Sequence, residues 1–285
     1  MFLGMGTRRS FSSKTVWPSV PLIYPWSSDS DVEMNIESIR REQDVYRRLK
    51  TPEDHRSSGI VHCIGVSTET TQLAYMANGD LRAYLKTCRP TYQLQLTWFH
   101  EMARTLAYIH DRCVLVADIA SRNFLLDSDL SLKFCDFSEA SLLSLDSDMQ
   151  SVDDNGYTTQ IDIGLIGTVI YKVVTGNKCE VDLYRDNSPT DGRAYWPERK
   201  HLPSTQGIWL GCIIEDCLNG NFRSAHNLLQ ALEPIDIPFS SPVNRPPSTC
   251  FLVSIKNFIK ERPITAIIGV LSLAICGLIV SRRKF

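Results

Sequence analysis

The side chains best suited to chemistry gather in the stretch VLVADIASRNFLLDSDLSLKFCDF, residues 114–137. Asp118 is followed five residues later by Asn123, and Asp136 comes after a turn rich in Asp and Ser. Two short apolar runs between them, 124–126 and 132–134, predict a hairpin of two strands. That hairpin would bring the three side chains to one cleft, and their oxygens are hard ligands of the kind that Mg²⁺ prefers. Taken singly, each of the three is an ordinary turn residue.

Apolar periodicity predicts the elements that must position this stretch. Short strands and turns are expected before residue 27, and "NGD" is expected to turn the chain into a short helix capped by Asp80. Strands are predicted over 59–67 and 70–76, and helices over 31–50, 81–87, 96–112, 160–176, 207–220 and 224–233. A strand-rich first part followed by a mainly helical second part predicts an α+β protein with two unequal lobes.

Composition excludes several classes of protein. The 285 residues are 43% apolar and 22% charged, which is globular composition with enough chain for a sizeable core. A net charge of −2 argues against a nucleic-acid partner, which would require a basic surface. The nine cysteines contain no CxxC, so they indicate free thiols in a reducing compartment and neither a disulfide framework nor a zinc site.

A transmembrane helix is predicted near the C-terminus, where residues 263–280 run 18 residues without a charge. A helix of that length reaches roughly 27 Å, close to the ~30 Å hydrocarbon core of a bilayer. Lys and Arg flank this run on both sides, where their long side chains can reach the lipid headgroups. The alternative interpretation of the run is a buried core helix. Because the N-terminus lacks a secretory signal, this predicts a single-pass C-terminal (tail) anchor with the rest of the chain facing the cytosol.

Together these pieces resemble the eukaryotic protein kinase domain, in a divergent form of fungal type. ADIASRN, residues 117–123, is similar to the kinase catalytic loop, and CDFS, residues 135–138, is similar to the D-F-G motif. The resemblance implies that Asp118 is the catalytic base and that Asn123 and Asp136 are the metal ligands for the Mg²⁺ of ATP. It covers most of residues 1–235 and is strongest between 75 and 176.

Further matches extend the resemblance to other parts of the chain. REQDVYRRL is similar to the regulatory helix, which implies a catalytic role for Glu42, and LAYMANGDLRAYL is similar to the hinge, with Leu73 as gatekeeper. Asp162 matches the buried Asp of the central helix, whose carboxylate would cap the backbone of the catalytic loop. The nucleotide contacts implied by the Gly-rich loop and the hinge backbone are Gly4, Gly6, Ala74 and Met76.

The resemblance implies a two-lobed kinase-like domain over residues 1–235, with the small lobe at about 1–76 and the large lobe at about 77–235. A Pro-rich linker is predicted over 236–250. Residues 251–262 form a juxtamembrane segment, either on the membrane surface or as a helical lead-in to the span over 263–280. Residues 281–285 are a basic tail.

The sequence also departs from the kinase pattern. The segment PLIYP, 21–25, occupies the place of the third strand, with Ile23 instead of its Lys, and Lys14 is the alternative cation upstream. Ser10 replaces the third Gly of the Gly-rich loop. Val116 and Ala117 replace the His and Arg of H-R-D, so loop phosphorylation has no arginine partner there. Ser138 replaces the D-F-G glycine, which restricts the backbone.

Two more departures concern the substrate. Ala120 and Arg122 follow Asp118 as they do in tyrosine-kinase-like loops. Only 26 residues separate Asp136 from Asp162, so the segment that holds a peptide substrate is short.

Two functions are therefore expected for the chain. The first is a membrane-anchored protein kinase that uses ATP and Mg²⁺ to phosphorylate a protein hydroxyl, weakly because the Lys and part of the segment are missing. The second is an inactive pseudokinase that acts as a membrane-tethered scaffold for a protein partner.

Overall fold

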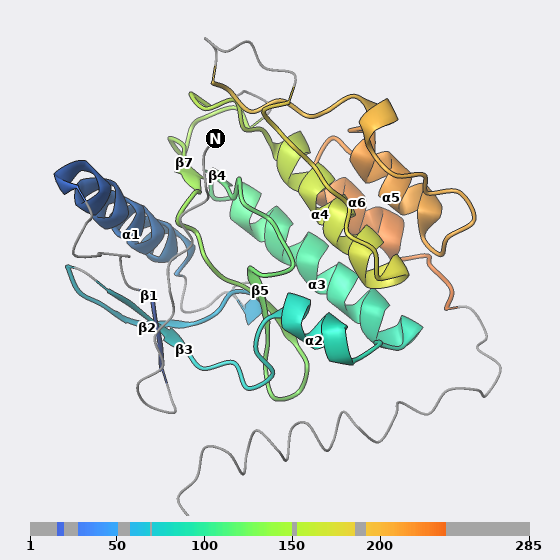
Figure 1. Ribbon diagram of the computed structural model, residues 1–285, viewed down its shortest axis with the longest axis horizontal. Coiled ribbons are helices and arrows are strands. Elements are labelled where there is room, and N and C mark those ends of the chain that lie inside the picture. Colours follow the sequence, from blue (N-terminus) through green and yellow to red (C-terminus); the bar gives the residue numbers. More distant parts are fainter. Residues whose placement is uncertain are drawn as a thin grey trace, which may run out of the picture. The chain divides into compact units, whose positions relative to one another are not determined.

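Figure 1 shows the computed structural model of the chain. The structure describes residues 28–50, 58–68, 70–149, 153–185 and 192–237, together with the backbone of 16–19. Apart from 87–89, these residues belong to one compact unit. The structure describes only the first two residues of the predicted Pro-rich linker, and the rest of the linker, the juxtamembrane segment, the predicted span 263–280 and the basic tail lie outside the described residues. No helix in the described ranges is long and apolar enough to cross a bilayer.

The first part of the fold is a three-stranded antiparallel sheet in the order β1-β3-β2. Its strands are β1 (Val16–Ser19), β2 (Cys63–Val66) and β3 (Thr71–Ala74). Pro18 lies in β1, at an edge of the described sheet, where a residue without an N–H is tolerated. Because β3 is paired on both sides, it is the central strand of this sheet.

The long helix α1 (Asp29–Leu49) follows the sheet strand β1. Ser28 and Asp31 form a reciprocal capping box: the Ser28 hydroxyl accepts from the Asp31 N–H at 3.2 Å, and the Asp31 carboxylate accepts from the Ser28 N–H at 3.0 Å. Ile39, Val45 and Leu49 are buried on one side of the helix. This amphipathic pattern is the one predicted for residues 31–50.

The second part is mainly helical, as the sequence predicts. Figure 1 shows α3 running alongside α4, with α5 and α6 packed against them. The helices are α2 (Leu81–Thr87), α3 (Tyr92–His110), α4 (Thr159–Thr175), α5 (Gly211–Leu218) and α6 (Ala225–Leu232), with a short 3₁₀ turn at Arg199–His201. Two small antiparallel pairs complete it: β4 (Val114–Leu115) with β7 (Ser141–Leu142), and β5 (Phe124–Leu126) with β6 (Leu132–Phe134). The predicted hairpin is therefore confirmed.

Two glycines let other segments approach the central helix α4 closely. A Cβ on Gly164 would lie 2.5 Å from the Trp196 ring, and one on Gly167 would lie 2.5 Å from the Cys217 Cβ. Both distances are shorter than real contacts allow, so any larger residue would push the neighbours away. The glycines explain how α4, which is apolar nearly all round, becomes buried between α5 and the segment around Trp196.

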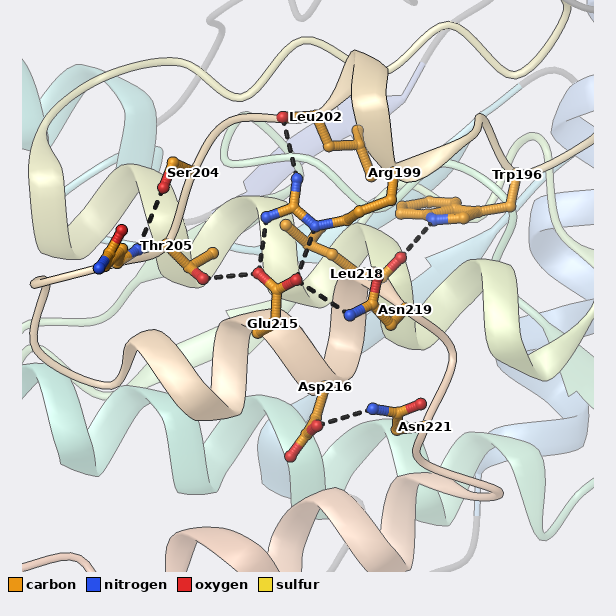
Figure 2. Close-up of polar contacts among 11 residues, drawn as sticks. Trp196, Arg199, Leu202, Ser204, Thr205, Glu215, Asp216, Leu218, Asn219 and Asn221 are labelled. Atoms are coloured by element: carbon orange, nitrogen blue, oxygen red, sulfur yellow. Dashed lines mark hydrogen bonds and ion pairs between the residues drawn. The ribbon is translucent and has the colours of Figure 1, made fainter.

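The segment before α5 is held by the polar network that Figure 2 shows. Arg199 donates to both oxygens of Glu215, with Nε–Oε1 at 2.8 Å and Nη2–Oε2 at 2.6 Å, while Thr205 donates to Oε2 at 2.6 Å. These donors, Arg199 first, lower the pKa of Glu215 to about 2. Trp196 adds a bond from its Nε1 to the Leu218 carbonyl at 2.7 Å, so the segment is fixed to α5 at two points.

We expect Glu215→Gln to lower the free energy of unfolding by about 1–2 kcal/mol at pH 7, because bidentate pairs are strong but this one is one-third exposed. The folded-state pKa lies below the ordinary value of 4.5, so the stabilisation is present above pH 4.5 and is lost as the pH falls toward 2. Urea unfolding at pH 7 and pH 3 measures both effects. Glu198→Gln, in an exposed pair with Lys200, is the control; an equal loss in both variants would contradict the prediction.

Candidate functional site

The β5–β6 hairpin brings Asn123 and Asp136 next to each other. The Cys135 N–H donates to the Asn123 carbonyl at 3.0 Å, one residue before Asp136. Within the hairpin the rings of Phe124 and Phe134 meet edge to face, with centroids 4.6 Å apart. Strand pairing and a buried aromatic contact therefore hold the backbone of the two candidate metal ligands at the ends of adjacent strands.

Asp118, the predicted base, is held by its two neighbours in the loop. Arg122 Nη2 lies 2.6 Å from both carboxylate oxygens, and Asn123 Nδ2 lies 2.9 Å from Oδ2 and 2.9 Å from the Asp118 carbonyl. Asn123 is buried, and these bonds commit its amide nitrogen to Asp118. The orientation leaves Asn123 Oδ1, a hard oxygen, as the atom of this amide that can accept a cation.

The carboxylate of Asp162, in the first turn of α4, holds the backbone of the same loop. It is fully buried and accepts from the N–H groups of Val116 and Ala117 at 2.8 and 2.9 Å. His110, the last residue of α3, places Nε2 2.9 Å from Oδ2. The predicted capping role of Asp162 is the geometry that the structure has, and these partners satisfy a charge that burial alone would make costly.

The backbone is strained at two positions of the candidate site: Ala117, which precedes Asp118, and Asp136 itself. Ala117 has φ 64° at the centre of a tight turn in which the Asp118 N–H donates to the Val116 carbonyl at 2.7 Å. Asp136 has φ 65°, whereas Ser138 does not lie in the left-handed region. The expected restriction at Ser138 therefore does not strain the chain, because the unusual conformation falls on Asp136.

Glu42 lies on α1 near the sheet and the D-F-G-like segment. Its side chain is 1% exposed, and burial followed by the Glu42 carboxylate raises the pKa of both Tyr46 and Cys63. Tyr46, one turn along α1, packs edge to face on Phe137 with centroids 5.3 Å apart. The predicted regulatory glutamate thus lies near Cys63 of β2 and one helical turn from the tyrosine that packs on Phe137.

Arginines of α1 reach the backbone of the segment that follows Asp136. Arg41 Nη1 donates to the Ser138 carbonyl at 3.2 Å. Arg48 Nη1 donates to the carbonyls of Leu143 and Arg112, both at 3.1 Å. These bonds tie α1 to the helical part of the protein at two places.

The segment between Asp136 and Asp162 is organised by Asp153, which is 9% exposed. Its carboxylate accepts from the Ser141 hydroxyl at 2.5 Å and from the N–H groups of Asn155 and Tyr157 at 3.0 and 2.7 Å. Residues 150–152 lie outside the described ranges. The bonds around Asp153 connect β7 to the turn that precedes α4.

The predicted hinge leaves the backbone N–H of Met76 available. Leu73 is 3% exposed, the Ala74 N–H donates to the His62 carbonyl at 2.8 Å, and the Met76 carbonyl accepts from the Gly79 N–H at 3.2 Å. The N–H of Met76 has no partner within the described part of the chain. A buried donor of this kind is suited to an acceptor on a bound ligand.

The central strand β3 is paired along its whole length with Val16–Ser19, and β2 takes its other side. Both Val16–Ser19 and residues 21–25, the segment expected at the place of the kinase third strand, are short apolar runs that contain Pro. Neither contains a lysine. Residues 21–25 themselves, with Gly4, Gly6, Ser10 and Lys14, lie outside the described residues.

Glu139 is a further carboxylate near Asp118 and Asp136, and the sequence analysis did not single it out. Partial burial raises its pKa, Arg41 lowers it, and the carboxylates of Asp118 and Asp136 raise it. Much of the Glu139 side chain is nevertheless exposed, so water screens these electrostatic effects. The signal available in the sequence was its place three residues after Asp136.

No cluster of three or more His, Cys, Asp or Glu side chains arranged for a metal occurs in the ranges that the structure describes. Mg²⁺ does not require one, because it is commonly bound through one or two carboxylates together with phosphate oxygens and water. Asn123 Oδ1 and the Asp136 carboxylate fit that kind of donor set. Ser138 Oγ, 2.8 Å from Asp136 Oδ1, orients this carboxylate.

Comparison with known proteins identifies relatives. A family model described as "Protein kinase domain" matches residues 26–188, more than half of the chain. A probable serine/threonine-protein kinase of Dictyostelium discoideum is 26% identical over 51% of this chain and 32% of its own length. The cytoplasmic tyrosine-protein kinase BMX of Mus musculus is 24% identical over 74% of this chain and 36% of its own length. The chain thus spans about a third of the length of these curated relatives.

We expect Asp162→Asn to lower the free energy of unfolding by about 3 kcal/mol, because the amide would turn a donor toward one of the buried N–H groups. Urea unfolding measures the loss, and hydrogen exchange reports the amides of Val116 and Ala117, which should lose protection first. Asp154→Asn, the same change at an exposed position, is the control. Unchanged stability together with unchanged protection at both amides would contradict the role given to Asp162.

Proposed function

Because this chain belongs to the protein kinase domain family, we propose that it binds ATP with Mg²⁺ and phosphorylates protein hydroxyl groups slowly. The observation that carries the proposal is the arrangement of Asp118, Asn123 and Asp136 on one loop and hairpin, with Asn123 Nδ2 committed to Asp118. The family implies ATP, Mg²⁺ and a protein substrate in general. The activity of this particular chain is our inference.

The proposal gives a role to each residue of the candidate site. When bound, ATP with its Mg²⁺ supplies the phosphoryl group that is transferred. Asp118 accepts the proton of the acceptor hydroxyl, and Arg122 holds this carboxylate in place. Asn123 Oδ1 and the Asp136 carboxylate would hold the metal, while the Met76 N–H and the backbone at Ala74 would contact the adenine.

The proposed rate is low because a cation is missing from the sheet. β1, the strand that pairs with the hinge strand, reads VWPS and carries no lysine for the phosphates. Losing one preorganised charged contact of that kind typically costs about 10²–10³ in rate. Glu42 stays buried on α1, but its usual lysine partner has no counterpart in β1.

The test uses the full chain, with and without Mg²⁺. We expect ATP to raise the melting temperature only when Mg²⁺ is present, and Asp136→Asn to abolish that shift because it removes a metal ligand. Transfer from labelled ATP should be slow in the wild type and should fall at least about 100-fold in Asp118→Asn, which removes the base. Asp154→Asn is the matched control. Transfer that is unchanged in Asp118→Asn would refute the catalytic proposal.

A scaffold without turnover is the second candidate function. Two observations favour it: the absence of lysine in β1, and the engagement of both Asp118 oxygens by Arg122. In that case the kinase fold would serve to hold a protein partner. An ATP-dependent shift without any transfer, or neither signal in a folded protein, would favour the scaffold over the kinase.

We also propose that residues 263–280 anchor the protein in a membrane with the kinase-like part facing the cytosol. The support is sequence alone: 18 uncharged residues with Lys and Arg on both sides. In fractionated cells we expect the full chain to resist alkaline extraction from membranes. Ile268→Arg with Leu273→Arg should release it, because each charge at the centre of a span costs about 2.5–3.5 kcal/mol.

The control for that experiment is Ile268→Leu with Leu273→Ile, which keeps the segment apolar. A wild-type chain that is extracted as readily as the double arginine variant would contradict the anchor.

A further inference from the structure

A group of basic side chains, which we call the cationic face, lies beside the loop that carries Asp118. Arg82 and Lys86 are four residues apart on α2, so they share one side of that helix. Lys172 is in the last turn of α4, and Lys178 follows the end of the same helix. Arg82, Lys86 and Lys178 are exposed, and Lys172 is half-buried.

The cationic face is joined to the catalytic loop through Ser121, three residues after Asp118. Lys172 Nζ donates to the Ser121 hydroxyl at 2.6 Å, and the Arg82 N–H donates to the Ser121 carbonyl at 2.9 Å. Ser121 is 6% exposed, which makes it a rigid point of attachment. Ser121 therefore fixes Lys172 and the backbone of Arg82 relative to the loop that carries Asp118.

Among the described residues, neighbouring carboxylates balance the charges of the cationic face only in part. Asp80 lies 3.9 Å from Arg82, and Glu180 pairs with Lys178 at 2.9 Å, but the latter pair is 72% and 79% exposed and therefore weak. Burial, followed by Arg82 and Lys178, lowers the pKa of Lys172, as expected where like charges gather. The excess is local, since the whole chain has a net charge of −2.

We propose that the cationic face binds an acidic segment of the substrate or partner protein and so holds that protein against Asp118. The chemistry of the contact is carboxylate, or phosphate already on the partner, paired with Arg82, Lys86 and Lys172. Opposite charges steer association and fix orientation more than they add affinity, which suits a transient acceptor. This inference rests on the proposed function, because it places the acidic segment at the same cleft.

The test measures binding, so it does not depend on turnover. A fluorescent peptide with one Ser, one Thr and one Tyr among Asp and Glu residues is titrated with the full chain, and anisotropy is recorded. Peptides of the same length with Lys and Arg, or with neutral residues, are run beside it. We expect the acidic peptide to bind at least about tenfold more tightly than either, and to weaken as salt rises, because exposed pairs are screened.

Two variants locate the contact. Arg82→Glu with Lys86→Glu reverses two exposed charges on α2 and should weaken the acidic peptide about tenfold or more, while Lys172→Gln should weaken it less. Arg104→Glu with Lys133→Glu changes the net charge by the same amount on α3 and β6, and should leave binding within about twofold. Circular dichroism and melting temperature confirm that each variant is folded.

The outcomes separate this inference from the proposed function. Three results would each overturn the proposal that the cationic face binds an acidic segment. They are equal binding of acidic and basic peptides, unchanged binding by the α2 variant, and tighter binding of a single-stranded oligonucleotide or an anionic vesicle. The thermal shift with ATP and Mg²⁺, measured on the same samples, would persist in that case. Conversely, loss of the ATP shift with retained peptide selectivity would overturn the nucleotide proposal and keep the cationic face.

Discussion

The buried carboxylate of Asp162 makes the interaction on which the candidate site depends. It receives the N–H groups of Val116 and Ala117 and the imidazole of His110, and so joins α3, the loop and α4 at one point. The left-handed conformation of Ala117 is unfavourable for an alanine, and these hydrogen bonds offset its cost. Asp118, the next residue, takes its direction from that turn, so the chemistry proposed at the surface is set by a charge in the core.

A second constraint is the attachment of α1. In an ordinary kinase the arginine of the catalytic loop and a phosphorylated segment help to place this helix, and here Ala117 occupies the position of the arginine. Arg41 and Arg48 instead bind backbone carbonyls at Ser138 and Leu143 directly. Such bonds need no added charge on the segment. They keep α1, which carries the buried Glu42, in place against the segment that follows Asp136.

The sequence carried local information well and long-range information poorly. The hairpin and α4 followed from periodicity, because each depends on residues close together in the chain. The role of Asp162, whose carboxylate binds the N–H of Val116 46 residues away, came from the resemblance to the kinase family. The pairing of Val16–Ser19 with β3 depends on register between distant strands, which short apolar runs do not encode. Likewise, nothing in the sequence joined Lys172 to Ser121, since that contact spans 51 residues.

The account stands on the claim that Asn123 and Asp136 together hold the metal of a bound nucleotide. A crystal structure of the full chain with Mg²⁺ and a non-hydrolysable ATP analogue tests this most directly. The account predicts the metal bound by Asn123 Oδ1 and the Asp136 carboxylate, with the adenine at the Met76 N–H. Well-ordered crystals grown with saturating analogue that show an empty cleft, or a metal held away from both side chains, would contradict it.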